Sequence, residues 1–241
     1  MPPSVLLAEH DQDRAAELQQ RLEALDLRVQ RAATGSDALQ LQGEADPDLV
    51  VVSLDLPDLH GFDVCRRLRR TSDVPLIVLG ERATGTDRVL ALELGADDFV
   101  GSACDGAEFQ ERVKAALRRA EGVDSRDGDG GVLDFGDIVI DRNAHTLTVG
   151  DRAEELTPME MELMWTLGRH AGEVMASEDL LQDVWGYPPD VRTRTLDVHI
   201  GRLRKKLGED GRNPRHIITI RSVGYRFEPH PDDSGEDGVA A

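Results

Sequence analysis

The sequence predicts the α/β fold class: a doubly wound five-stranded parallel sheet, followed by a second, smaller domain. Three observations support this. Residues 1–120 alternate short apolar runs with helical patterns, a rhythm typical of a parallel sheet covered by helices. Residues 121–131, EGVDSRDGDGG, are rich in Gly and Asp and are expected to form a flexible linker. Residues 132–228 then change to short alternating strands, helices and a closing hairpin, and a chain of 241 residues can hold two such cores.

Five apolar runs are the expected strands of the first domain: SVLLA at 4–8, a weaker LRVQRA at 27–32, DLVVV at 48–52, PLIVL at 75–79 and DDFVG at 97–101. Helical patterns lie between them, near 12–25, 36–43, 61–71, 84–94 and 105–120. In a doubly wound sheet the functional crevice lies at the carboxyl ends of the strands. The residues just after Ala8, Val52, Leu79 and Val100 are therefore expected to converge.

The second domain begins with short strands separated by turn signals, in LDFGDIVIDRNAHTLTVGDRAEELT. A helix follows, because Thr157 suits the N-cap, Pro158 the first helical position and Glu160 the reciprocal position of a capping box. Further helices are expected near 177–184 and 192–207, and HIITIRSVGYRFEP reads as strand, turn and strand. The acidic tail, 229–241, is expected to be disordered.

Composition excludes several classes of function. The net charge of −19 argues against a protein that coats nucleic acid or anionic membranes indiscriminately, yet residues 191–226 hold ten basic and three acidic residues. A polyanion is expected to dock there. Because no run approaches the roughly 20 apolar residues of a membrane span and no signal peptide is recognisable, we expect a cytoplasmic protein without a membrane partner. Cys65 and Cys104 are too few for a disulfide framework or a zinc site.

The basic window contains an amphipathic helix. Its apolar stripe is expected to pack on the preceding helices, and it consists of Leu196, Ile200, Leu203 and Leu207. The opposite face carries Arg194, Val198, Arg202 and Lys205, extended by Thr195, His199 and Lys206. Such a helix has the shape and charge to enter the major groove of DNA, and Arg221, near the hairpin tip, can reach the adjacent minor groove. The alternative is an ordinary solvated face.

Four motifs favour DNA binding over that alternative: LTPMEMELM, LLQDVWG, RTLDVHIGRLRKKL and IRSVGYRF. Through them, residues 132–228 resemble the winged helix-turn-helix domain of OmpR/PhoB-type response regulators. The resemblance places Arg194, Thr195, Val198, His199, Arg202 and Lys205 on the recognition helix and Arg221 on the wing. It also implies double-stranded promoter DNA as a partner, and contact with RNA polymerase through the loop 185–191.

Residues 1–120 resemble the flavodoxin-like receiver domain of the same family, through VLLAEHDQD, LDLPDLHGFDVCRRLR and LELGADDFV. The family's phosphorylation pocket needs an acidic pair for magnesium, an aspartate nucleophile, a Ser or Thr, and a Lys. At the matching positions this chain has Glu9, His10, Ser53, Gly80 and Ser102. Four of the five roles are lost, so the resemblance implies an atypical receiver that uses neither metal nor cofactor and that is not phosphorylated on an aspartate.

The resemblance also implies a homodimer that pairs through the fourth helix, the fifth strand and the fifth helix. Charges of complementary sign are present at the matching positions: Arg88, Glu93, Asp97, Asp98, Glu108, Arg112, Lys114 and Arg119. We therefore expect a transcriptional regulator that dimerises on adjacent half-sites independently of aspartyl phosphorylation. That account requires Arg202 to be accessible to DNA.

Two alternatives keep the same domains but change the signal: a small molecule in the neutralised crevice, or a displaced phosphorylation at Asp55. A hydrolase using Ser53 and His10 is disfavoured because no G-x-S-x-G motif is present, so no enzymatic activity is expected. A protein-interaction scaffold would leave the basic helix and the hairpin without a role.

Overall fold

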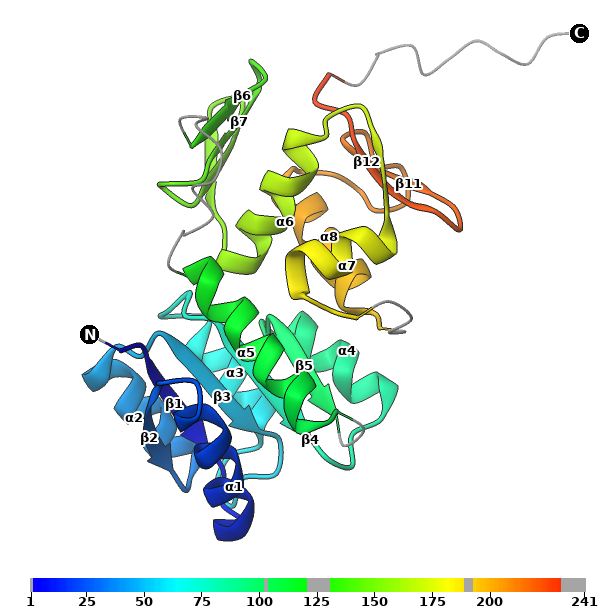
Figure 1. Cartoon of the computed structure of the whole chain (residues 1–241). Coiled ribbons are helices and arrows are strands. Elements are labelled where there is room, and N and C mark those ends of the chain that lie inside the picture. Colours follow the sequence, from blue (N-terminus) through cyan, green and yellow to red (C-terminus); the bar gives the residue numbers. More distant parts are fainter. Residues whose placement is uncertain (1, 102–103, 121–130, 189–192, 231–241) are drawn as a thin grey trace, which may run out of the picture.

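The computed structural model describes residues 2–101, 104–120, 131–188 and 193–230, and it confirms the predicted fold class. Two domains lie against each other, as Figure 1 shows, with the receiver-like sheet below and the domain that ends in a hairpin above. Residues 121–130 of the predicted linker and 231–241 of the predicted tail lie outside the described residues.

The first domain contains a parallel five-stranded sheet in the order β2-β1-β3-β4-β5. Its strands are β1 (Ser4–Ala8), β2 (Arg28–Ala32), β3 (Leu49–Ser53), β4 (Leu76–Gly80) and β5 (Asp98–Gly101). The helices are α1 (Gln12–Glu23), α2 (Gly35–Ala45), α3 (Gly61–Leu68), α4 (Gly85–Glu93) and α5 (Gly106–Ala120). Both β3 and β4 are buried along their whole length, because α1 and α5 cover one face of the sheet and α2, α3 and α4 the other.

The second domain opens with an antiparallel four-stranded sheet of β6 (Val132–Asp134), β7 (Ile138–Asp141), β8 (Thr146–Val149) and β9 (Arg152–Glu155). Three helices follow: α6 (Pro158–Arg169), α7 (Ser177–Trp185) and α8 (Thr195–Lys206). The predicted capping box is present at the start of α6, where Thr157 and Glu160 exchange hydrogen bonds.

The closing hairpin, β11 (Ile217–Ile220) and β12 (Gly224–Phe227), takes up a third strand, β10 (Val174–Ala176), in the order β10-β12-β11. A Cβ at Gly224 would lie 1.9 Å from the carbonyl oxygen of Met175, so this close approach of two strands requires glycine. The hairpin and the three helices together form the winged helix-turn-helix arrangement.

The two domains meet along one side of the receiver. Helix α8 packs on α4, while α6 and α7 pack on α5 (Figure 1). This arrangement was not predicted from the sequence, and it decides which of the predicted site residues are accessible. Among the described residues, none of the helices is long and apolar enough to cross a membrane.

Candidate functional site

The crevice at the carboxyl ends of the strands brings together the residues predicted to line it. Glu9 follows β1, Ser53 ends the neighbouring β3 and Gly80 ends β4. The Ser53 hydroxyl donates a short hydrogen bond to the Glu9 carboxylate, and both residues are buried. The backbone N–H of Asp11 donates to the other Glu9 oxygen at 2.9 Å. Ser102 lies outside the described residues.

Arg14, on the first turns of α1, is a crevice residue that was not predicted from the sequence. Its Nε lies 3.5 Å from Oε2 of Glu9, and its Nη1 lies 3.5 Å from Glu81, the residue after β4. A buried carboxylate is costly unless it is paired and hydrogen-bonded. Arg14 therefore supplies an internal positive charge beside Glu9. In the sequence, Arg14 stands five residues after Glu9 near the start of a predicted helix, and this position could have indicated that its side chain reaches the crevice.

The donor set does not fit the magnesium ion that the family's receivers use. Both Glu9 oxygens already accept hydrogen bonds, His10 supplies a half-exposed imidazole 3.3 Å from Glu9, and Asp11 caps α1. Asp55 is exposed in the loop after β3. Among the described residues, no group of three or more His, Cys, Asp or Glu side chains is arranged to hold a metal ion. Magnesium prefers several carboxylate oxygens, so this crevice lacks its ligands.

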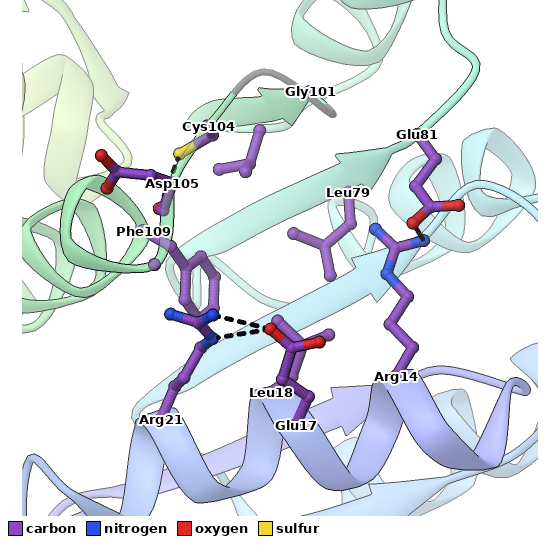
Figure 2. Close-up of a pocket in the computed structure, with 12 residues that line it drawn as sticks. Arg14, Glu17, Leu18, Arg21, Leu79, Glu81, Gly101, Cys104, Asp105 and Phe109 are labelled. Carbon is purple, nitrogen blue, oxygen red and sulfur yellow. Dashed lines mark hydrogen bonds and ion pairs between the residues drawn. The ribbon is translucent and has the colours of Figure 1, made fainter.

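A cavity of about 180 Å³ lies beside the crevice, between α1 and the ends of β4 and β5. Figure 2 shows Arg14 and Arg21 extending from α1 toward it, each with a carboxylate partner, Glu81 and Glu17 respectively. Its apolar lining consists of Leu18, Leu79, Val100 and Phe109. The cavity thus combines an apolar floor with charged walls, a combination that can take a small polar molecule.

On the surface formed by α4, β5 and α5, residues predicted to pair with a sister subunit contact the chain's own second domain. Arg112 donates to Asp98 Oδ2 at 3.0 Å and to the hydroxyl of Tyr187, in the second domain, at 2.9 Å. The Tyr187 hydroxyl in turn donates a short hydrogen bond to Asp98. All three residues are buried. Burial alone would lower the pKa of Arg112, but Asp98 raises it above its ordinary value.

Asp97 is the third predicted dimer residue that the structure buries. Its carboxylate accepts hydrogen bonds from Arg69 at 2.6 Å and from the backbone of Leu76 at 2.8 Å, and its carbonyl accepts one from the Trp185 indole at 3.0 Å. Burial raises the pKa of the Asp97 carboxyl. Asp97, Asp98 and Arg112 therefore hold the chain's own second domain in this structure and are not free to meet a sister subunit.

The remaining predicted dimer residues lie around this contact. Arg88 places its guanidinium 5.5 Å from the centroid of the Phe99 ring, and Glu108 bonds to Arg112. Lys114 pairs with Glu111 at 2.7 Å on the exposed side of α5, and Glu93 is exposed. The side chain of Arg119 lies outside the described part of the chain.

Several residues of α8, the predicted recognition helix, are less exposed than contact with DNA requires. Thr195 and His199 are fully buried, and only 14 % of the Arg202 side chain is exposed. Arg202 donates to the carbonyl of Ala96 in the receiver at 3.4 Å, and Val198 packs against the receiver core. Arg202 and Val198 are therefore not open to DNA in this conformation, because α4 and the segment around Ala96 lie against this part of α8.

Burial also changes the titration of these groups. It lowers the pKa of His199 to about 4, with a further contribution from Arg202, and the His199 ring packs edge-on against Trp185. Burial likewise lowers the pKa of Arg202. Burial would raise the pKa of Glu160, but Lys206 and Arg202 together hold it below its usual value. These groups form one charged cluster between the domains.

Three predicted DNA-binding residues are exposed: Arg194, Lys205 and Arg221. Arg194 precedes α8 and pairs with Asp197 at 2.8 Å, while Arg221 lies in the turn between β11 and β12. The loop 185–191, predicted to touch RNA polymerase, contributes Trp185 and Tyr187 to the domain contact instead. Its residues 189–191 lie outside the described part of the chain. Neither aromatic residue was predicted to contact the receiver, although two large aromatic side chains on either side of Gly186 could have indicated a buried contact.

Comparison with known proteins matches both domains to known families. Residues 5–114 match the response regulator receiver domain, and residues 151–227 match the C-terminal domain of transcriptional regulatory proteins. The transcriptional regulatory protein AfsQ1 of Streptomyces coelicolor is 40% identical over 227 residues, covering 94% of this chain and 99% of the relative. The DNA-binding response regulator MtrA of Mycolicibacterium smegmatis is 42% identical over 195 residues, covering 81% and 83%.

Two solved structures are similar along both domains. A RitR mutant superposes with a TM-score of 0.71 at 26% identity, covering 94% of this chain and 99% of that one. DrrB, an OmpR/PhoB homologue of Thermotoga maritima, gives a TM-score of 0.50 at 30% identity, covering 95% and 100%.

A receiver followed by a winged-helix transcriptional regulatory domain defines a response regulator. The chain belongs to the OmpR/PhoB type of that family, whose C-terminal domain implies DNA binding and whose role is transcriptional regulation.

Proposed function

We propose that the protein is a sequence-specific regulator that works without aspartyl phosphorylation, and that its receiver covers the recognition helix until the two domains separate. The observation that carries this proposal is the burial of Arg202 and Val198 of α8 against the receiver. A helix that is packed on α4 cannot enter a major groove at the same time. DNA and the receiver therefore compete for one face of α8.

Phosphorylation independence is supported by the contents of the crevice. The Ser53 hydroxyl donates a hydrogen bond to Oε2 of Glu9, whereas the His10 imidazole lies 3.3 Å from Oε1 of the same carboxylate, so the hydroxyl is not aimed at His10. A serine hydroxyl is a weak nucleophile unless a base activates it, and the Glu9 carboxylate that it contacts is already paired with Arg14. Arg14 already neutralises Glu9, so the crevice lacks the charges on which a phosphoryl group and a divalent cation act.

In the separated state, Arg194, Val198, Arg202 and Lys205 reach the major groove and Arg221 the minor groove. Thr195 and His199 support α8 from inside, since Thr195 contacts Tyr187 and His199 contacts Trp185. Separation also uncovers Asp97, Asp98 and Arg112 for pairing with a second copy, which would set two recognition helices on adjacent half-sites. The loop 185–191 then becomes available to RNA polymerase.

A second candidate concerns the signal. The cavity beside the crevice, with its apolar floor and its Arg14 and Arg21 walls, favours control by a small polar molecule. Displaced phosphorylation at Asp55 has weaker support, because its exposed side chain lies in the loop two residues beyond the end of β3. Nucleophilic attack requires near-in-line positioning, which a displaced carboxylate does not provide.

The test combines a phosphodonor with a binding assay. The purified protein is incubated with acetyl phosphate and magnesium, its intact mass is measured, and its affinity is determined for a duplex selected from genomic fragments. We expect no stable adduct and no change in affinity. The Asp55→Asn variant is the matched control for displaced modification. An adduct on the wild type accompanied by tighter DNA binding would overturn phosphorylation independence, and loss of that adduct in the variant would assign it to Asp55.

A further inference from the structure

The cavity between α1 and the ends of β4 and β5 has an apolar floor of defined size. Arg14, Leu18 and Arg21 lie on one face of α1, because helical positions i, i+4 and i+7 share a face, and all three line the cavity. Leu79 of β4 and Phe109 of α5 line it as well and are almost fully buried. The cavity volume is about 180 Å³. Since an engineered cavity of about 150 Å³ holds benzene, an apolar group of about four to six carbon atoms fits here.

The Arg21 side chain at this cavity is fixed by its own neighbours. It donates to one Glu17 oxygen from Nε at 3.1 Å and from Nη2 at 2.6 Å. Its guanidinium also lies against the start of α5, where a Cβ on Gly106 would collide with Nη1. Arg21 therefore forms a wall of the cavity and has little capacity for a further partner.

Arg14 is held more loosely than Arg21. Its Nη1 lies 3.5 Å from Oε1 of Glu81, whereas a charge-assisted hydrogen bond between such groups measures about 2.7–2.9 Å. Its Nε lies equally far, 3.5 Å, from Oε2 of Glu9. More than half of the Glu81 side chain is exposed, and an exposed ion pair contributes little to stability. Arg14 and Glu81 thus form a loose ion pair at the edge of the cavity, as Figure 2 shows.

The charges of the lining select among classes of ligand. Two arginines line the cavity together with three carboxylates, those of Glu17, Glu81 and Asp105. An anion is repelled by this surplus of negative charge, and a cation meets the guanidinium of Arg14. A zwitterion avoids both penalties, because its carboxylate can face Arg14 while its ammonium group faces Glu81. Its insertion replaces one long contact by two short charge-assisted hydrogen bonds.

We propose that the cavity binds a free α-amino acid with an apolar side chain of about four carbon atoms. The ligand carboxylate accepts hydrogen bonds from Arg14, and the ligand ammonium group donates to Glu81. The apolar side chain packs on the floor formed by Leu18 and its neighbours. Such an amino acid would be the small polar signal of the proposed function, on which this inference rests.

The test is isothermal titration of the full chain with L-leucine and with two analogues that each lack one charge. The analogue 4-methylpentanoate lacks the ammonium group, and 3-methylbutylamine lacks the carboxylate. We expect saturable binding of one L-leucine per chain and binding about tenfold weaker for either analogue, since each loses one charge-assisted hydrogen bond. Absence of saturable L-leucine binding would overturn the inference, and so would equal affinity for L-leucine and 4-methylpentanoate, which would indicate a simple anion site.

Glu81→Gln removes the partner of the ligand ammonium group from an exposed position. This variant should bind L-leucine about tenfold more weakly than the wild type, but 4-methylpentanoate no more weakly. Glu111→Gln is the matched control, since it removes the same charge from an exposed side chain that pairs with Lys114 on α5, away from the cavity lining. It should leave both affinities unchanged. If Glu81→Gln weakened both ligands equally, Glu81 would have only a structural role and the inference would fail.

Leu18→Phe tests the location of the site by filling the cavity while keeping Arg14 and Glu81. L-Leucine binding should be lost, and retained affinity would place the ligand elsewhere and contradict the inference. DNA affinity is then measured with and without saturating L-leucine. Unchanged DNA affinity, together with the expected titrations, would support the site and refute small-molecule control in the proposed function.

Discussion

The charged side chains on two surfaces of the receiver have different kinds of partner. In the crevice, Glu9 is satisfied locally by Ser53, Asp11 and Arg14, so its charge is cancelled within one domain. On the α4–β5–α5 surface, Asp98 and Arg112 pair with each other within the receiver, and both also form hydrogen bonds with Tyr187 of the other domain. The charge of Glu9 is thus balanced inside the receiver, whereas the charges of Asp98 and Arg112 also contact the second domain. Signals are therefore expected to act on the domain contact.

The largest effect should come from the centre of that contact. Arg112→Ala leaves the buried Asp98 carboxylate without its cation, and breaking a buried pair in this way costs about 3–5 kcal/mol. Urea unfolding should show this loss, and scattering should show separated domains. Lys114→Ala is the control, since Lys114 is exposed on the same helix and pairs only with Glu111; its effect should stay within about 0.5 kcal/mol. Equal losses in the two variants would contradict the comparison.

A smaller substitution at the domain contact should change DNA affinity with little loss of folding stability. Tyr187→Phe removes one buried hydroxyl between the domains at a cost of about 1 kcal/mol, and DNA affinity should rise several-fold because the closed state is weakened. Tyr225→Phe removes a hydroxyl that donates to Asp197 at 2.8 Å, within the DNA-binding domain. Fluorescence anisotropy should show no gain for that variant. If DNA affinity rose in both variants, the domain contact would not be the cause, because Tyr225 lies outside that contact.

The last prediction concerns pH and changes no contact at neutral pH. Burial holds the pKa of His199 at about 4, below the 6.5 of an exposed histidine, so the unfolded chain takes up a proton that the folded chain excludes. Stability contributed by neutral His199 is present above pH 6.5 and falls as the pH drops toward 4. We expect a loss of about 1–2 kcal/mol between pH 7 and pH 5. His199→Gln should remove this slope in urea unfolding, while the exposed control His170→Gln should keep it.

Much of the fold could be predicted because burial leaves a plain record in the sequence. The runs that became β3 and β4 are almost wholly apolar, and each of the five receiver strands begins within one residue of its prediction. The capping box of Thr157 and Glu160 was recognisable because its spacing is fixed by the helix. Local patterns of this kind do not depend on the second domain.

The sites were less predictable for a physical reason. Amphipathic spacing in α8 identified the stripe that packs within its own domain. Arg202 and Val198 are instead buried by the receiver, and a contact between domains produces no repeating pattern in the sequence. Asp98 and Arg112 have signs that suit a sister subunit and suit Tyr187 equally well. Arg14 went unrecognised because it occupies none of the five positions at which the sequence was compared with the family's phosphorylation pocket.

The contact between Arg202 and the Ala96 carbonyl has one more consequence. Under the proposed function, the receiver presents the Ala96 carbonyl oxygen to the guanidinium that an operator would otherwise engage, and so competes with DNA within the same molecule. By thermodynamic linkage, whatever weakens this contact by a given factor strengthens operator binding by that factor. Operators that bind with different affinities should therefore also differ in the fraction of molecules whose two domains they separate.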